Sequence, residues 1–201
     1  MRHPLSRLAP CSALAAAALV IVAPFSAPAL ADPVTPDAAA PLLFAHDRVE
    51  VARYTLEGLS EDEREIIIGI AQEQPYYAAM AFAPDQGILA EPTVFAANYH
   101  SRETAHAAAL AQCNALRTGG RPCTLALEVR PAGWEARALH LSADATEEFG
   151  GDFRRAPAPR AFAISEQTAA WGTGAGDAAA ETALEACAEA GATDCRVVIA
   201  D

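Results

Sequence analysis

The stretch Ala183-Leu184-Glu185-Ala186-Cys187, followed by Cys195, decides the fold of this chain. The same Ala-Leu-x-x-Cys pattern occurs earlier as Ala109-Leu110-Ala111-Gln112-Cys113, and Cys123 follows it. We interpret the two copies as an internal duplication. A duplication predicts two structural units with the same order of elements, each with its own pair of cysteines.

The residues around each copy indicate strands and a helix. An Ala-Phe-Ala tripeptide precedes each copy, at 81–83 and at 161–163, within apolar runs typical of strands. In the first unit we expect strands over 76–83, 88–99 and 123–129 and a helix over 102–116 that Ser101 caps. In the second we expect strands over 160–165, 168–173 and 195–200 and a helix that Asp177 caps and that runs to Ala190. A unit of about 45 residues buries too little core alone. The sequence therefore predicts an α+β fold in which two tandem ββαβ units pack as one body.

The N-terminus has the features of a secretory signal peptide. Arg2 and Arg7 precede an apolar run over 12–22, and Ala29-Leu30-Ala31 matches a cleavage site. The run is shorter than the roughly 20 apolar residues of a membrane-spanning helix, so no stable membrane insertion is expected once the leader is removed. We predict cleavage near Ala31 and a mature bacterial protein that is periplasmic or secreted.

The cysteines indicate disulfides. Cys11 leaves with the predicted leader, and the four cysteines that remain form an even set in an exported chain, which favours disulfides over metal or redox chemistry. Four cysteines allow three pairings. Because two equivalent units would each form a local bridge, the repetition favours Cys113–Cys123 and Cys187–Cys195. Closing a loop of this size contributes about 2–3 kcal/mol.

The charge of the chain restricts its partners. The formal net charge is −12 for the whole chain, and it becomes −14 when the two arginines of the leader are removed. Such a surface repels nucleic acid and anionic lipid and attracts a basic exported protein or a cationic ligand. The chain also contains no lysine, which excludes a Schiff base, pyridoxal-phosphate chemistry of the aminolevulinate synthase kind, and a P-loop. No cofactor is expected.

Five segments follow from these patterns. They are a signal peptide over 1–31, a flexible and then helical N-terminal segment over 32–74, a first ββαβ unit over 75–130, a connecting strand, short helix and linker over 131–159, and a second ββαβ unit over 160–201. In the N-terminal segment, residues 49–56 fit helical spacing, and Ser60 with Glu63 predicts a capping box at the start of a helix that Pro75 ends. In the connecting segment we expect a strand over 134–141 and helical turns over 142–149.

Several polar and glycine motifs suggest chemistry only weakly. Glu103-x-x-His106 resembles half of a carboxylate–histidine metal site, and His100 lies six residues before His106, which is not the spacing of a zinc pair. The acidic cluster Asp144, Glu147, Glu148 and Asp152 lacks the spacing of a calcium loop. The Gly172-x-Gly174-x-Gly176 run is one residue too short for a dinucleotide loop and is interpreted as a tight strand-to-helix turn. No metal ligands and no catalytic nucleophile are predicted.

Three aromatic residues are the candidates for a binding surface. Trp171 lies beside glycines on a predicted strand, where one face of its ring can stay open. Tyr99 ends the predicted strand 88–99 of the first unit, and Trp134 begins the strand expected after that unit. A role in the core is the alternative for each of them.

The second copy also resembles a known group. Ala161-Phe162-Ala163-Ile164-Ser165, Trp171-Gly172, the Ala-Leu-x-x-Cys helix and Cys195-Arg196-Val197-Val198 are similar to a small exported bacterial domain of unknown function. The resemblance covers about 45 residues well and 81–129 more loosely. It implies export and a disulfide-linked α+β fold, and it supplies no catalytic residues. We therefore expect an exported, non-enzymatic binding or interaction module. The alternatives are a small cell-envelope hydrolase that uses acidic residues and a structural component of an envelope complex.

Overall fold

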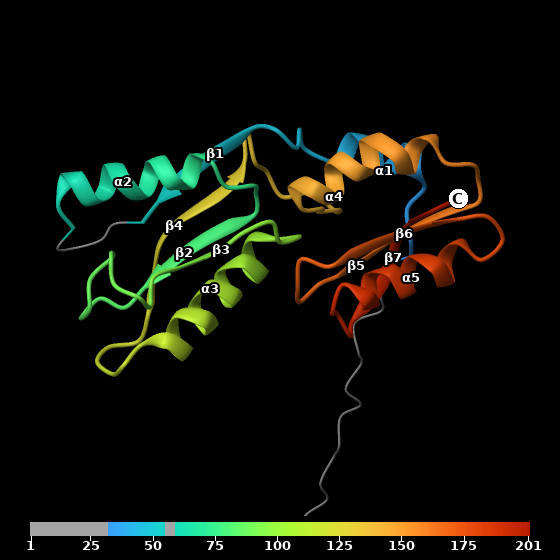
Figure 1. Ribbon diagram of the computed structural model, residues 1–201. Coiled ribbons are helices and arrows are strands. Elements are labelled where there is room, and N and C mark those ends of the chain that lie inside the picture. Colours follow the sequence, from blue (N-terminus) through green and yellow to red (C-terminus); the bar gives the residue numbers. More distant parts are fainter. Residues whose placement is uncertain (1–31, 55–58) are drawn as a thin grey trace, which may run out of the picture. The chain divides into compact units, whose positions relative to one another are not determined.

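Two antiparallel sheets carry the described part of the chain (Figure 1). The computed structural model describes residues 32–54 and 59–201, so the predicted leader, its cleavage site and Cys11 lie outside the described residues. No helix in this described part has the length and hydrophobicity needed to cross a membrane. The α+β class predicted from the sequence is confirmed.

The first sheet has four strands in the order β1-β4-β2-β3. Their bounds are β1 Val49–Arg53, β2 Ala78–Phe82, β3 Val94–Ala96 and β4 Thr124–Pro131. Helix α3, Arg102–Leu116, packs on one face, and helix α2, Glu61–Gln72, packs on the other (Figure 1).

The second sheet has three strands in the order β6-β5-β7. Their bounds are β5 Arg160–Ser165, β6 Trp171–Ala175 and β7 Cys195–Ala200. Helix α5, Ala179–Glu189, covers one face. Short elements cover the other face, namely α1 Pro36–Ala39, the 3-10 turn η1 Ala40–Leu42, α4 Ala143–Glu148 and the π-helix η2 Phe149–Phe153.

Both predicted disulfides are present. Cys113–Cys123 joins α3 to the residue before β4, and Cys187–Cys195 joins α5 to the first residue of β7. The Cα atoms are 6.1 Å apart in each bridge, a normal separation for a disulfide. The bonds agree with an oxidising compartment.

Alanine lets each long helix lie close to its sheet. Ala105, Ala109 and Cys113 are fully buried along α3, at intervals of four residues on one helix face. On α5 the buried residues at the same spacing are Ala179, Ala183 and Cys187. The strand side of both interfaces is also alanine, at 79 and 81 in β2 and at 161 and 163 in β5. The Ala-Leu-x-x-Cys pattern therefore indicates the contact between helix and sheet as well as the disulfide.

The strand register corrects the alignment of the two copies. The ladder shifts between Met80 and Ala81 in β2 and between Phe162 and Ala163 in β5, so Met80 corresponds to Phe162. The two Ala-Phe-Ala tripeptides are therefore not equivalent, and matching them was wrong by two residues. A shift of two residues keeps every side chain on the same face of a strand, which explains why the error left the predicted elements in place.

Three expected strands differ from the observed ones. The strand expected over 88–99 is only Val94–Ala96, because turns occupy most of 84–93. The strand expected over 168–173 is shifted to 171–175. The strand expected over 134–141 is absent from the described structure. Leu139 and Leu141 instead bury themselves against the second sheet, and β1 already occupies the neighbouring edge of β4.

The N-terminal segment differs most from its prediction. Val49–Arg53 forms strand β1 and pairs with β4, although its apolar spacing had suggested a helix. The start of the 32–74 segment, expected to be flexible, makes defined contacts: Val34 bridges to Ile199, and Thr35 caps α1. The pairing partner of a strand lies far away in the sequence, so local spacing could not reveal it.

The helix caps agree with the sequence in all but one case. Ser60 and Glu63 form the predicted capping box, and Ser101 caps α3 through the backbone N–H of Thr104. Asp177 does not cap α5, whose N-cap is Ala178 without a side-chain bond. Gly172 and Gly174 lie within β6 and not in the turn. Glycine is needed at both positions because α5 passes too close to the strand for a side chain. A Cβ on Gly174 would lie 2.1 Å from the carbonyl oxygen of Ala179.

Candidate functional site

Four arrangements in the described residues concentrate polar chemistry. The first is a cluster around Glu128, which lies on β4 with 2 % of its surface exposed. Arg102 donates two hydrogen bonds to its Oε2, from Nε at 3.1 Å and Nη2 at 2.9 Å, and also lies 2.9 Å from its Oε1. His106 Nε2 lies 2.7 Å from Oε2, and the Tyr54 hydroxyl donates to the same oxygen at 3.0 Å. α3 and the end of β1 are thus tied to the middle of the first sheet.

Glu128 is held as an anion. Burial alone would raise its pKa, but the hydrogen bonds from His106, Arg102 and Tyr54 outweigh it and lower the pKa to about 2. At neutral pH this carboxylate has no proton to donate, and its donors already occupy its oxygens. The cluster therefore has the character of a structural ion network rather than of a general acid.

Trp134 completes this cluster from outside. The guanidinium carbon of Arg102 lies 4.4 Å from the centre of its ring, and that of Arg130 lies 5.6 Å away. The ring also packs against the core of the first unit. Trp134 thus makes cation–π contacts with Arg102 and Arg130. Its packing against the core agrees with the core role that the sequence left open for it.

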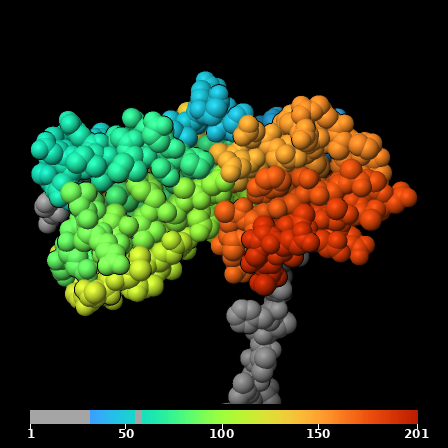
Figure 2. Space-filling model, viewed as in Figure 1, coloured from blue at the N-terminus to red at the C-terminus, as the bar shows by residue number. Residues whose placement is uncertain are grey.

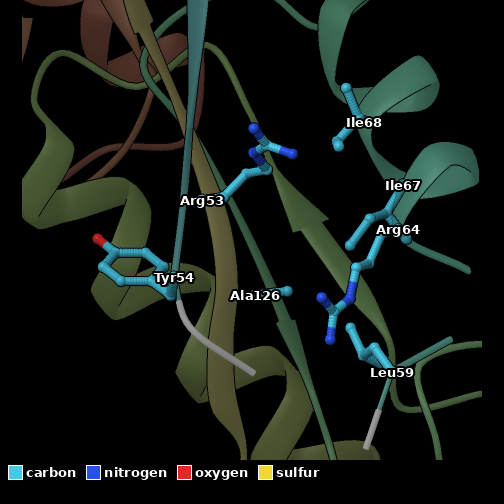
Figure 3. A pocket seen from close by; sticks show the side chains of 7 residues that line it. All are labelled: Arg53, Tyr54, Leu59, Arg64, Ile67, Ile68 and Ala126. Carbon is cyan, nitrogen blue, oxygen red and sulfur yellow. The ribbon is translucent and has the colours of Figure 1, made fainter. Parts of the chain in front are cut away.

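The second arrangement is a cavity of about 300 Å³ between β1 and α2, shown in Figure 3. Its apolar lining consists of Leu59, Ile67, Ile68 and Ala126. Figure 3 shows Arg53, from β1, and Arg64, from α2, extending into the space between strand and helix. The ring of Tyr54 points to the other side of the strand, where its hydroxyl reaches Glu128.

The third arrangement is a cavity of about 300 Å³ between the two units. His100 borders it and is buried, with Nε2 3.0 Å from the carbonyl oxygen of Ala170 and Nδ1 accepting the N–H of Ser142. Burial lowers the pKa of His100 to about 4. Glu166 and Arg196, on the same border, form an ion pair with each other. The polar groups named here thus already have partners within the protein, and the bond of His100 to Ala170 connects the first unit to the second.

The fourth arrangement brings together Trp171 and the acidic residues of 144–152, which lie apart in the sequence. A depression of about 380 Å³ is bordered by Trp171 and by the whole acidic cluster, with Gly151 and Arg155 completing the border. The carboxylates of this cluster are Asp144, Glu147, Glu148 and Asp152. Because they come from α4 and η2 while Trp171 comes from β6, only the folded chain assembles them. We call this arrangement the acidic pocket.

One face of the Trp171 ring is already covered. The ring stacks on Phe162, with 5.6 Å between centres and 26° between planes, and the residue is only partly buried. The indole therefore rests on the core of the second sheet and borders the acidic pocket.

The field inside the acidic pocket is negative. Partial burial and the neighbouring charge of Asp152 raise the pKa of Glu148, while Arg155 opposes the change. Arg155 pairs with Asp152 at 2.6 Å, but both side chains are largely exposed, so their attraction is weak. A carboxylate whose ionisation is disfavoured by its neighbours gains from a nearby cation.

The predicted aromatic residues do not form one surface. Tyr99 and Trp134 pack against the core of the first unit, whereas Trp171 packs against that of the second. Glu128 and Tyr54 were not predicted from the sequence, where Glu128 looks like any other charged residue of a strand. The only sequence signal for Glu128 is its position inside the apolar run 125–129.

No group of metal-ligating side chains is found in the part of the chain that the structure describes. His106, singled out with Glu103, instead binds Glu128. Comparison with known proteins gave no match to a family model, to a curated protein or to a solved structure. A function for this protein is therefore proposed from the geometry of the described residues.

Proposed function

We propose that this chain is an exported, non-enzymatic binding module whose acidic pocket takes a cationic group of a basic partner. The observation that carries the proposal is the meeting of Trp171 with four carboxylates. An aromatic face attracts a guanidinium or ammonium group through its π-electrons. Carboxylates beside the ring add charge-assisted hydrogen bonds.

The chemistry of the pocket favours arginine-like groups. A guanidinium is planar, so it can stack on the indole while its N–H groups reach the carboxylates. The pocket already holds one guanidinium–carboxylate contact, the ion pair of Arg155 with Asp152. The net charge of −12 also accelerates the approach of a basic protein.

The test uses an arginine-rich hexapeptide and its citrulline counterpart, which has the same shape without the charge. The mature protein is expected to bind the arginine peptide, and Glu148→Gln to weaken binding by about fivefold in titration calorimetry. The matched control is Glu185→Gln, an exposed residue of α5 outside the pocket, with less than a twofold effect. Equal binding of the citrulline peptide, or equal effects of the two variants, would contradict the proposal.

Export and the duplication belong to the same proposal. Supporting export are the leader pattern of the sequence and the two disulfides, which point to the periplasm or the external medium. Supporting the duplication are the equivalent strand orders β3-β2-β4 and β6-β5-β7. The resemblance to an exported domain of unknown function stays a prediction. Sequencing the N-terminus of the exported protein tests the expected start at Asp32.

The two alternative functions stay predictions with separate tests. A hydrolase that uses acidic residues draws no support from Glu128, whose carboxylate is fully engaged. Activity on cell-envelope material that is lost on mutating a facing carboxylate pair would establish that class. Co-purification with membrane-bound subunits would instead establish a structural component of an envelope complex.

A further inference from the structure

We propose a second binding site of the opposite polarity: the cavity between β1 and α2 binds a small amphiphilic anion, an acyl carboxylate with a short chain. This site is independent of the acidic pocket, because no residue borders both. Its segments lie at the surface of the first unit, where α2 is seen in Figure 2. We call it the arginine pocket.

The floor of the arginine pocket is apolar. Ile67 and Ala126 are exposed by only 4 % and 2 %, and Leu59 and Ile68 are partly buried around them. These side chains offer an aliphatic chain a surface with no polar group to desolvate. Each methylene that such a floor removes from water raises affinity about fourfold.

The charge around this floor is the unusual feature. Arg53 and Arg64 border the pocket, and no carboxylate is among the described residues that line it, in a chain with a net charge of −12. Within residues 32–54 and 59–201, nothing forms a hydrogen bond or an ion pair with the side chain of Arg53, which is exposed. A guanidinium at the edge of an apolar floor is suited to a carboxylate head group with an aliphatic tail.

The size of the pocket limits the ligand. Its volume of about 300 Å³ is at the lower end of small-molecule sites, which favours a short chain such as octanoate over a full-length lipid. Octanol and octylamine have similar tails without the anionic head. Comparing the three separates the role of Arg53 from that of the floor.

The experiment follows the methyl signals of the isoleucines by NMR in the mature protein. Octanoate is expected to shift Ile67 and Ile68 and to leave Ile164 and Ile199 of the second unit unchanged. Hexanoate, two methylenes shorter, is expected to bind about sixteenfold more weakly. Octanol and octylamine are expected to bind more weakly than octanoate.

The matched variants are Arg53→Gln and Arg48→Gln. Arg53→Gln is expected to weaken octanoate binding about tenfold, and Arg48→Gln, which removes an exposed arginine outside the pocket, less than twofold. Arg53→Gln is also expected to leave binding of the arginine hexapeptide unchanged, which keeps the two sites distinguishable. Because the side chain of Arg53 is exposed, the variant is expected to fold.

Several results would overturn the site. They are the absence of shifts at millimolar octanoate, octanol binding as tightly as octanoate, and equal effects of the two arginine variants. Cosedimentation with phosphatidylglycerol vesicles that Arg53→Gln abolishes, without binding of free octanoate, would overturn it in favour of a membrane surface.

Discussion

The two ββαβ units agree on one face of each sheet and differ on the other. On the face of the long helix, alanines and a cysteine of α3 match those of α5, and each disulfide closes the same contact. On the opposite face, the first sheet is covered by the single helix α2, and the second by α1, α4 and the π-helix. Both proposed pockets border these covering elements.

This difference indicates which parts of such a fold can vary. Small side chains and a disulfide fix the distance between helix and sheet, so a larger residue there would clash. The covering elements come from segments outside the repeated pattern, and they can change without disturbing that contact. The repeated face therefore supports the unit, and the elements that cover the other face border the proposed binding sites.

The largest expected effect comes from removing a residue that only the first unit has. Glu128 pairs with Ala79 in the register in which Ala200 pairs with Ala161, so Glu128→Ala makes the first sheet resemble the second. We expect a loss of about 4 kcal/mol in the free energy of unfolding, because Arg102 loses its buried counter-charge and the hydrogen bonds of His106 and Tyr54 lose their acceptor. Urea denaturation measures it.

The control for Glu128 is a surface ion pair of the second unit. Glu166→Ala removes the partner of Arg196, and Glu166 is exposed, so the loss is expected to stay below about 1 kcal/mol. Equal losses would show that the Glu128 cluster does not distinguish the units.

The next effect concerns the contact between the units and depends on pH. The pKa of His100 is about 4 in the fold, below its ordinary value of 6.5, because burial disfavours the charged ring. The unfolded chain therefore takes up this proton first as the pH falls. Stability from the neutral ring is complete above pH 6.5 and decreases by about 3 kcal/mol between pH 7 and pH 4.

His100→Gln isolates this contribution from the other titrating groups. Glu128 and His140 also have lowered pKa values and destabilise the fold in the same direction on acidification. The variant is expected to flatten the dependence of unfolding free energy on pH between 7 and 4, measured by urea denaturation at each pH. An unchanged slope would exclude His100 as its source.

The smallest expected effect tests how closely the second helix approaches its sheet. Gly174 corresponds to Ala96 in the register of the first sheet, yet a Cβ on it would meet the backbone of α5 at 2.1 Å. Gly174→Ala is therefore expected to cost about 1–3 kcal/mol in thermal unfolding. Gly69→Ala, with nothing within 4 Å of the new Cβ, is expected to be neutral or stabilising. A Gly174→Ala variant with unchanged stability would mean that α5 can move away from its sheet far enough to admit the methyl group, as the first sheet admits Ala96.

Much of the frame could be read from local patterns. Ser60 with Glu63, and Ser101, placed the starts of α2 and α3, because a cap depends on residues three apart in the chain. The doubled Ala-Leu-x-x-Cys pattern gave both disulfides, because each joins neighbours in sequence. The predicted cap of α5, Asp177, was wrong because no side chain caps this helix.

The class of fold, the long helices and the bridges thus follow from local patterns in the sequence, because each depends on nearby residues. Only the tertiary structure decided that Val49–Arg53 joins β4, that Glu128 is buried among arginines, and that Trp171 meets the acidic cluster. Those outcomes depend on residues that lie far apart in the chain and meet only when the sheets are covered. Binding chemistry in this protein lies in such long-range contacts, which no local periodicity encodes.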